Sequence, residues 1–332
     1  MWRPRMIVVN LVLVAVGFVL LCLNVSHGDF PIPPTDVARV LLGGGDTVDR
    51  FIVVDLRLPR SLVGLLVGLA LGASGAISQA LTRNPLASPD MLGITAGSSA
   101  AAVAVIVYGG ALAAVWWGLP LAALVGGLVT AVAVYLLSWR NGVEGFRLIL
   151  VGIGLNALLV AATEWILVSA DLNDVARANL WLNGSLEEVD WLDAGPVLLA
   201  VACGTAVIVV AAFGLSALML GDDAATALGE RVRMSQAVLL LTSVALAAIS
   251  VAAVGPVGFV AFVAPQLAVR LVRTPRPPLV ASALMGALML VGSDLAARTL
   301  LPGDLPVGVV TTAIGGPFLM YLIIRANRRF GR

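Results

Sequence analysis

Few side chains in this sequence have the chemistry that catalysis or metal binding requires. His27 is the single histidine, and the two cysteines, Cys22 and Cys203, lie inside apolar runs where they behave as small hydrophobic residues. These residues cannot form a zinc site or a Ser-His-Asp triad. All 20 basic side chains are arginine, so the chain lacks the lysine of a nucleotide-binding P-loop. We therefore expect no catalytic residue, metal or cofactor in this chain, and ATP with magnesium only on a partner.

Polar side chains inside apolar runs are the next candidates for a function, because a charge within the bilayer is costly unless it faces protein or water. Asn156 and Glu164 lie in the apolar segment 147–169 and are predicted to line a pathway. For Glu164 the alternative is an interfacial position beside Trp165. Asp294 and Arg298 are four residues apart, a spacing that places them on one helix face near the membrane edge.

The segment 216–236, SALMLGDDAATALGERVRMSQ, is polar, carries both signs of charge and separates two long apolar runs. Its pattern predicts short helices over 217–220 and 224–228, joined at Gly221 and stopped at Gly229. A connector between membrane spans usually needs only a few residues. A structured connector therefore indicates that a partner docks there, and the alternative is a merely solvated loop.

The elements that position these residues are membrane spans. The chain is 60% hydrophobic and 12% charged over 332 residues, which is too apolar for a soluble globular domain. Its apolar runs are close to the ~20 residues that cross a bilayer. We predict an all-α polytopic protein, a single transmembrane domain over 1–332 with about ten spans: 6–25, 61–81, 91–108, 115–138, 147–169, 195–215, 237–254, 257–272, 279–300 and 307–324.

The connecting segments carry further signals. The first run has no signal-peptide cleavage site and is predicted to stay as a helix. Residues 28–60 and 170–194 are polar excursions, with short helices expected from Thr35 and over 175–182. Glycines at 64, 68 and 72 let another helix approach the second span closely. A break is expected at Gly255–Pro256, and the following span should be interrupted at Pro265.

Arginine distribution sets the orientation, because cytoplasmic loops are enriched in basic residues. Ten crossings place both termini on one side. With the termini inside, fourteen arginines lie inside and six outside, counted along the sequence. We therefore predict cytoplasmic termini, a cytoplasmic 216–236 segment, and an outer face that bears Arg57, Arg60 and Arg298.

Four separated motifs give a specific resemblance. Residues 57–93 (RLPRSLVGLLVGLALGASGAISQALTRNPLASPDMLG), GDDAATALG, GPVGFVAFVAP and LPVGVVTTAIGGPF resemble the FecCD-type permease subunits of bacterial iron–siderophore, haem and cobalamin ABC importers. The likeness covers about residues 5 to 326. The runs WRNGVEGFRLILVGIG and MLGDDAATALG are most similar to one of the two subunits of the ferric enterobactin permease.

The resemblance implies a type II ABC importer permease fold of ten helices in the bacterial inner membrane. It implies several partners: a second, non-identical permease subunit, two cytoplasmic ATPase subunits, an extracytoplasmic binding protein and a ferric siderophore. Nucleic acid is not among the expected partners. The implied ATPase-coupling residues are Leu220, Gly221, Asp222, Asp223, Ala224, Ala227, Leu228 and Gly229.

The same resemblance implies roles for three other sets of residues. Arg57, Arg60 and Arg298 would meet acidic residues of the binding protein, although interfacial arginines of this kind also simply anchor helices. Asn84 and Leu86 of the RNPLA loop would form a cytoplasmic gate. Gln266 stands where many relatives have histidine, which puts a protonation role at that position in doubt.

Two alternatives stay open on the sequence alone. The cargo of such a permease could be haem or cobalamin instead of a ferric siderophore. A different class, an ion-coupled secondary transporter, would use broken helices and embedded ionisable residues. Gly255–Pro256 and Gly315–Gly316–Pro317 are the possible breaks, but the structured 216–236 segment has no role in that mechanism.

Overall fold

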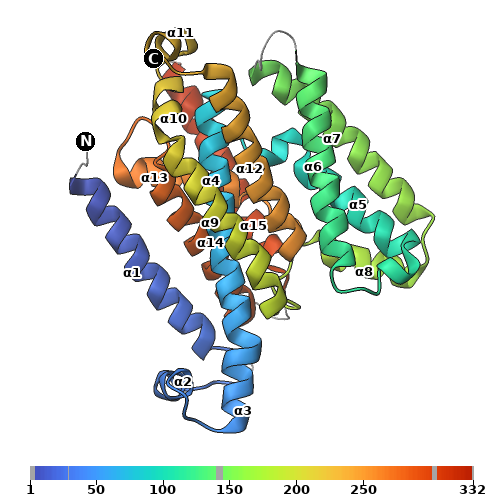
Figure 1. Ribbon diagram of the computed structural model, residues 1–332. Helices are drawn as coiled ribbons and strands as arrows, with labels where there is room; N and C mark the ends of the chain where they lie inside the picture. The colour runs from blue at the N-terminus through green and yellow to red at the C-terminus, as the bar shows by residue number, and fades with distance from the viewer. Residues whose placement is uncertain (1–3, 29, 140–144, 301–304, 331–332) are drawn as a thin grey trace.

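The structure is a computed structural model that describes residues 4–28, 30–139, 145–300 and 305–330 (Figure 1). The described residues form helices and turns, with no strand among them. Seven helices are long and apolar enough to cross a membrane: α1 (Pro4–Ser26), the continuous helix Thr47–Thr82, α6 (Gly118–Ser138), α7 (Gly145–Val168), α9 (Trp191–Val210), α12 (Val232–Val254) and α14 (Leu279–Thr299).

Three helices with shorter apolar stretches complete the set, namely α5 (Ile94–Tyr108), α13 (Val260–Val272) and α15 (Val307–Phe330), whose apolar part is Val307–Leu322. Each of these ten helices overlaps one predicted span, so the all-α polytopic prediction is confirmed. Short helices fill the connections: α2 (Pro34–Leu41), α8 (Leu172–Leu182), α10 (Ala212–Leu218), α11 (Asp222–Ala227), and the 3₁₀ turns η2 (Pro89–Leu92) and η3 (Gly110–Leu112).

The helices form two groups that α12 joins. One group holds α1, α4 (Leu58–Thr82), α9, α13, α14 and α15, and the other holds α5 to α8 (Figure 1). α12 contacts α4 and α9 in the first group and α5 and α6 in the second. The short helix α11 and the C-terminus lie at one end of the molecule, while α2, α3 (Thr47–Arg50) and α8 lie at the other.

α4 is central to the first group because its glycines let neighbouring backbones touch it. A Cβ at Gly68 would lie 2.5 Å from the Gly286 carbonyl oxygen of α14, and one at Gly72 would lie 2.2 Å from that of Ser282. Gly75 faces α13 in the same way, with the Ala261 carbonyl oxygen 1.7 Å from where its Cβ would be. The predicted packing role of this glycine stripe is confirmed.

The second span begins earlier than predicted. Residues 47–60 were assigned to a polar excursion, but the chain is helical from Thr47 through α3, the π-helix η1 (Phe51–Arg57) and α4. The excursion's short helix from Thr35 is present as α2. Pro59 has no N–H to donate, and it lies in the first turn of α4 directly after the wider π turns, where a proline does not stop a helix.

Pro265 does not interrupt α13, contrary to the prediction. Its ring nitrogen cannot donate to the Ala261 carbonyl one turn earlier, but that carbonyl lies against Gly75 of α4. The next carbonyl, of Phe262, accepts from Gln79 Nε2 at 3.1 Å. α4 therefore packs directly against this turn of α13, and the helix continues through the proline. The predicted break at Gly255–Pro256 is present, whereas Gly315–Gly316–Pro317 lies inside the unbroken α15.

Candidate functional site

An open cavity of about 760 Å³ lies between the two groups of helices. Asn156 and Glu164, eight residues apart on α7, are both on its wall. Leu86 and Asp90 line it from the loop between α4 and α5, and Phe262 and Leu319 line it from α13 and α15. The structure thus brings the two predicted pathway residues and one of the two predicted gate residues to a single, largely apolar surface.

The ionisable side chains among the described residues that line this cavity are both carboxylic acids, Asp90 and Glu164. Asp90 lies in η2, outside the spans. Its side chain is partly buried and lines the cavity. This burial raises the pKa of the Asp90 carboxyl, and a hydrogen bond from the Thr95 hydroxyl partly opposes the shift. No pattern in the sequence marks Asp90, which the fold brings to the cavity.

The predicted gate loop is a compact turn at the end of α4. Arg83 ends the helix in the left-handed conformation, with φ 51°. Asn84 Oδ1 accepts from the Leu86 backbone N–H at 2.9 Å, and the Asn84 carbonyl accepts from Ala87 N at 3.1 Å. The Asn84 side chain thereby shapes the turn, and Leu86 is the member of the pair that reaches the cavity.

The coupling segment (residues 216–236) is a folded projection, as predicted, although its first helix lies earlier in the chain. The sequence indicated helices over 217–220 and 224–228, and the structure has α10 over 212–218 and α11 over 222–227. The predicted span 195–215 instead ends at Val210, and the chain turns at Ala211 into α10. Side-chain burial explains the shift, because Leu215, Ala217 and Leu218 pack against the end of α4.

Gly229 stops α11 as predicted. It adopts φ +82°, its N–H donates to the Thr226 carbonyl, and Glu230 N–H donates to the Ala225 carbonyl. This pair of bonds is the Schellman arrangement that satisfies the last carbonyls of a helix. Gly221, with φ +115°, begins α11 in the same left-handed half of backbone space.

The predicted coupling residues divide by exposure. Leu220 and Leu228 are 58% and 54% exposed although they are large and apolar. Asp222 and Asp223 are exposed in the first turn of α11, Ala227 and Gly229 are exposed, and Gly221 and Ala224 are half-buried. Ala225, which was not predicted, is fully buried against α10 and α4 and anchors the projection.

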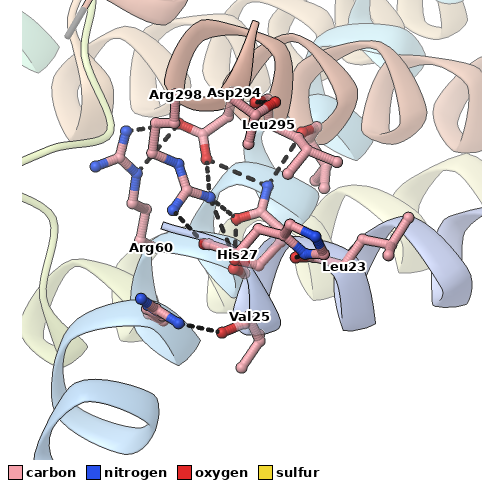
Figure 2. Close-up of polar contacts among 12 residues, drawn as sticks. Leu23, Val25, His27, Arg60, Asp294, Leu295 and Arg298 are labelled. Atoms are coloured by element: carbon pink, nitrogen blue, oxygen red, sulfur yellow. Dashed lines mark hydrogen bonds and ion pairs between the residues drawn. The ribbon is translucent and has the colours of Figure 1, made fainter. Parts of the chain in front are cut away.

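The outer arginines lie in a buried network instead of on an exposed surface. Asp294 is 1% exposed, and its two oxygens bind Arg60 at 2.8 Å and Arg298 at 3.1 Å (Figure 2). Asn24 of α1 joins the network, since its amide donates to Asp294 Oδ2 at 3.2 Å and its side-chain oxygen accepts from Ser61 and Arg298. Asp294 and Arg298 lie on one face of α14, as their spacing predicted, and they form an ion pair in which Asp294 is buried.

Arg57 is also buried, at 7% exposure. Its guanidinium donates to the carbonyls of Val25, Ser26 and Phe30 at 3.0, 3.2 and 2.5 Å. Arg60 and Arg298 keep only 19% and 12% of their side-chain exposure, so the three arginines do not form an open surface. The carbonyls at the end of α1 lack donors within the helix and draw the arginines inward. Direct contact with a binding protein stays a prediction.

Gln266 is buried and hydrogen-bonded. Its Nε2 donates to Gln79 Oε1 at 2.7 Å, and Gln79 in turn binds the Phe262 carbonyl. The position therefore links α13 to α4 through two amides, which do not titrate. Among the described residues, no group of His, Cys, Asp and Glu side chains is arranged to hold a metal ion.

Comparison with known proteins agrees with this arrangement. The model of the FecCD transport family matches residues 14–325. The chain belongs to the FecCD transport family. It is 40% identical over 330 residues to the ferric enterobactin transport system permease protein FepG of Escherichia coli K12, covering 98% of both chains. It is 35% identical over 316 residues to a second protein of that organism, the ferric enterobactin transport system permease protein FepD, covering 92% of both.

A solved structure has the same fold. It is described as an inward-facing conformation of a putative metal-chelate type ABC transporter, with a TM-score of 0.82 and 25% identity over 95% of this chain and 98% of that one. The chain is therefore the permease of an ABC importer, a multi-pass protein of the bacterial inner membrane, and separate subunits hydrolyse ATP. Family membership decides against the secondary-transporter alternative.

Proposed function

We propose that this chain is one of two non-identical permease subunits that together move a ferric siderophore into the cytoplasm. The observation that carries the proposal is the folded coupling segment. Its exposed Leu220 and Leu228 flank a well-capped α11 at the end of the molecule where the C-terminus lies (Figure 1). Two cytoplasmic ATPase subunits would bind such projections, one on each permease subunit.

The relatives support a second permease subunit that differs from this chain. Escherichia coli K12 has two ferric enterobactin permease proteins, FepG and FepD, and this chain is similar to both but more identical to FepG. A FepD-like second subunit would face α7 and α15 and complete the wall of the cavity. An extracytoplasmic binding protein would deliver the chelate to the face that holds α2, α3 and α8.

The orientation rests on charge. Fourteen of the twenty arginines fall on the side of the termini and of the coupling segment when the ten spans are threaded through a bilayer. Both termini would therefore be cytoplasmic, together with the gate loop and α11. Addition of a membrane-impermeant label to cysteines introduced in α8 and in α11 tests this, and we expect intact cells to expose only the α8 site.

The names of the relatives and the size of the cavity support a ferric siderophore as the cargo. A chelated iron is bulky, and the cavity lining offers mainly apolar surface. To test the function, the chain would be reconstituted in liposomes with the neighbouring permease, ATPase and binding proteins. We expect ATP-dependent entry of a radio-iron siderophore and none without ATP. ATP-dependent entry of haem or cobalamin, with no entry of any ferric siderophore, would contradict the proposal.

A further inference from the structure

The gate loop and the coupling segment, 139 residues apart in sequence, meet at Arg83. The Arg83 guanidinium forms an ion pair with the Asp222 carboxylate in the first turn of α11. The same nitrogen donates to the carbonyl of Leu218, the last residue of α10, at 2.9 Å. One side chain therefore holds the end of α10 and the start of α11 together.

The backbone of Arg83 begins the gate loop. Its left-handed φ of 51° turns the chain out of α4, and the next residue, Asn84, forms the turn that presents Leu86 to the cavity. A continuous series of contacts thus runs from α11 through Asp222 and Arg83 to Leu86. The series is short, because only Asn84 and Pro85 separate Arg83 from Leu86.

An apolar cluster supports the same junction from beneath. Ile77 and Ala80 of α4 pack with Leu218 of α10 and Ala225 of α11, and all four are buried. The end of α4 and the coupling segment therefore form one packed unit from which the gate loop extends. A displacement of α11 is transmitted to Arg83 most directly through Asp222, since this ion pair crosses from the segment to the loop itself.

A second arginine holds the segment without touching the loop. Arg276, in the turn between α13 and α14, donates to the Met219 carbonyl at 3.1 Å. The segment is thus held from two sides, by Arg83 on the gate loop and by Arg276 on the turn. The two arginines therefore allow loosening of the segment to be tested apart from loss of its contact with the gate loop. Removal of the Arg276 bond loosens the segment, while the contact between the segment and the gate loop remains.

We infer that Arg83 is a positioning residue that links ATPase-driven movement of α11 to the gate loop through its ion pair with Asp222. The inference rests on the proposed function, since it requires an ATPase at α11. Both side chains are about half exposed, at 49% and 54%. An ion pair of this exposure contributes modestly, so we expect its loss to weaken the link about two- to fivefold rather than abolish it.

The test reads the gate loop directly and needs no siderophore. Cys22→Ser and Cys203→Ser remove the native thiols, and Leu86→Cys places a thiol on the loop. In the reconstituted complex, the rate of modification by a maleimide is measured with and without ATP and vanadate. We expect a nucleotide-dependent change in rate, and a change two- to fivefold smaller with Arg83→Gln or Asp222→Asn. Combining the two substitutions should reduce it no further than Arg83→Gln alone, because Arg83→Gln already removes the ion pair with Asp222 together with the bond to the Leu218 carbonyl.

Charge exchange supplies the rescue and its control. Arg83→Asp with Asp222→Arg restores the pair in reverse and should recover most of the nucleotide response. Arg83→Asp with Asp223→Arg makes the same change of charge one residue away and should not. Arg276→Gln should keep the response within twofold of the background, since it leaves the Arg83–Asp222 contact in place. ATPase bound to each variant is quantified, and rates are compared per bound ATPase.

Three results would overturn the inference. They are an undiminished response in Arg83→Gln and Asp222→Asn, equal behaviour of the matched and mismatched exchanges, and no nucleotide response in the background. In the first case the apolar cluster alone carries the movement, and ATP-dependent siderophore uptake by the wild-type complex would still support the proposed function. Absence of that uptake would instead remove the proposed function and, with it, the inference.

Discussion

At the scale of single residues, the buried Asp294 shows why arginines occupy the outer end of this chain. Arg60 and Arg298 neutralise its carboxylate, and Arg298 also reaches the carbonyls of Asn24 and His27. Together with Arg57, these side chains supply donors to the end of α1, where a helix leaves its last carbonyls without partners. The arginines thus fasten α1 to α4 and α14.

The first prediction concerns this network. Asp294→Asn leaves two guanidinium groups in a largely buried site without their carboxylate, a change that typically costs about 3–5 kcal/mol. We expect a large drop in the unfolding midpoint of the purified chain in detergent. Asp36→Asn is the control, because its ion pair with Arg39 is well exposed and contributes at most about 1 kcal/mol. Equal midpoints for the two variants would contradict the buried pairing.

The second prediction concerns Asp90 and pH. Burial raises the pKa of this carboxyl above its ordinary value of 3.8. The folded state therefore holds the proton more tightly than the unfolded state, so the stabilisation is complete below pH 3.8 and is lost as pH rises through the folded pKa. Asp90→Asn is neutral at every pH and should remove this part of the decline. Unfolding midpoints of the wild-type chain and of Asp90→Asn, measured from below pH 3.8 upward, check this prediction. Parallel curves of midpoint against pH for the two proteins would refute it.

At the scale of elements, close backbone contact with α4 decides which interruptions matter. The prolines at 59 and 265 look like breaks in the sequence, yet both lie within helices. At Pro265, a neighbouring helix packs directly against this turn of α13. The glycines at 68, 72 and 75 permit that contact, because any side chain there would meet backbone of α13 or α14.

The third prediction tests this contact. Gly75→Ala places a methyl group 1.7 Å from the Ala261 carbonyl oxygen, so α13 must move away. Overpacking of this kind typically costs about 1–3 kcal/mol, and the midpoint of thermal unfolding should fall. Gly154→Ala in α7 is the matched control. It has nothing within 4 Å of the added carbon and should be neutral or stabilising by about 0.5–1 kcal/mol, because alanine favours helix.

At the scale of the whole molecule, the sequence was sufficient for the architecture but not for contacts between distant residues. Run lengths and composition predicted the spans, and Gly229 predicted the end of α11, because each signal is local. Pairings such as Arg83 with Asp222, or Arg60 with Asp294, depend on which helices lie side by side, and the spacing within one segment does not show that. The burial of Arg57 is not visible in the sequence for the same reason, since Ser26, whose carbonyl binds it, is 31 residues away.

The fourth prediction concerns the surface at which the whole assembly meets. Leu220 and Leu228 are large, apolar and more than half exposed at the end of the molecule that bears α11 (Figure 1). A docked ATPase would bury both side chains, and a carboxylate in their place would lose its water without gaining a partner, so Leu220→Asp with Leu228→Asp should reduce co-purification of the ATPase subunits about tenfold or more. The fold should be unaffected, because neither side chain belongs to the buried clusters.

The control for that variant is Leu42→Asp. Leu42 is 89% exposed at the end of α2, on the opposite end of the molecule, so the same chemical change is made far from α11. We expect it to leave the amount of bound ATPase unchanged. If Leu42→Asp and the double variant released the ATPase equally, the loss would report a general defect of the membrane complex. If the double variant kept the ATPase bound, the coupling segment would not be its docking site.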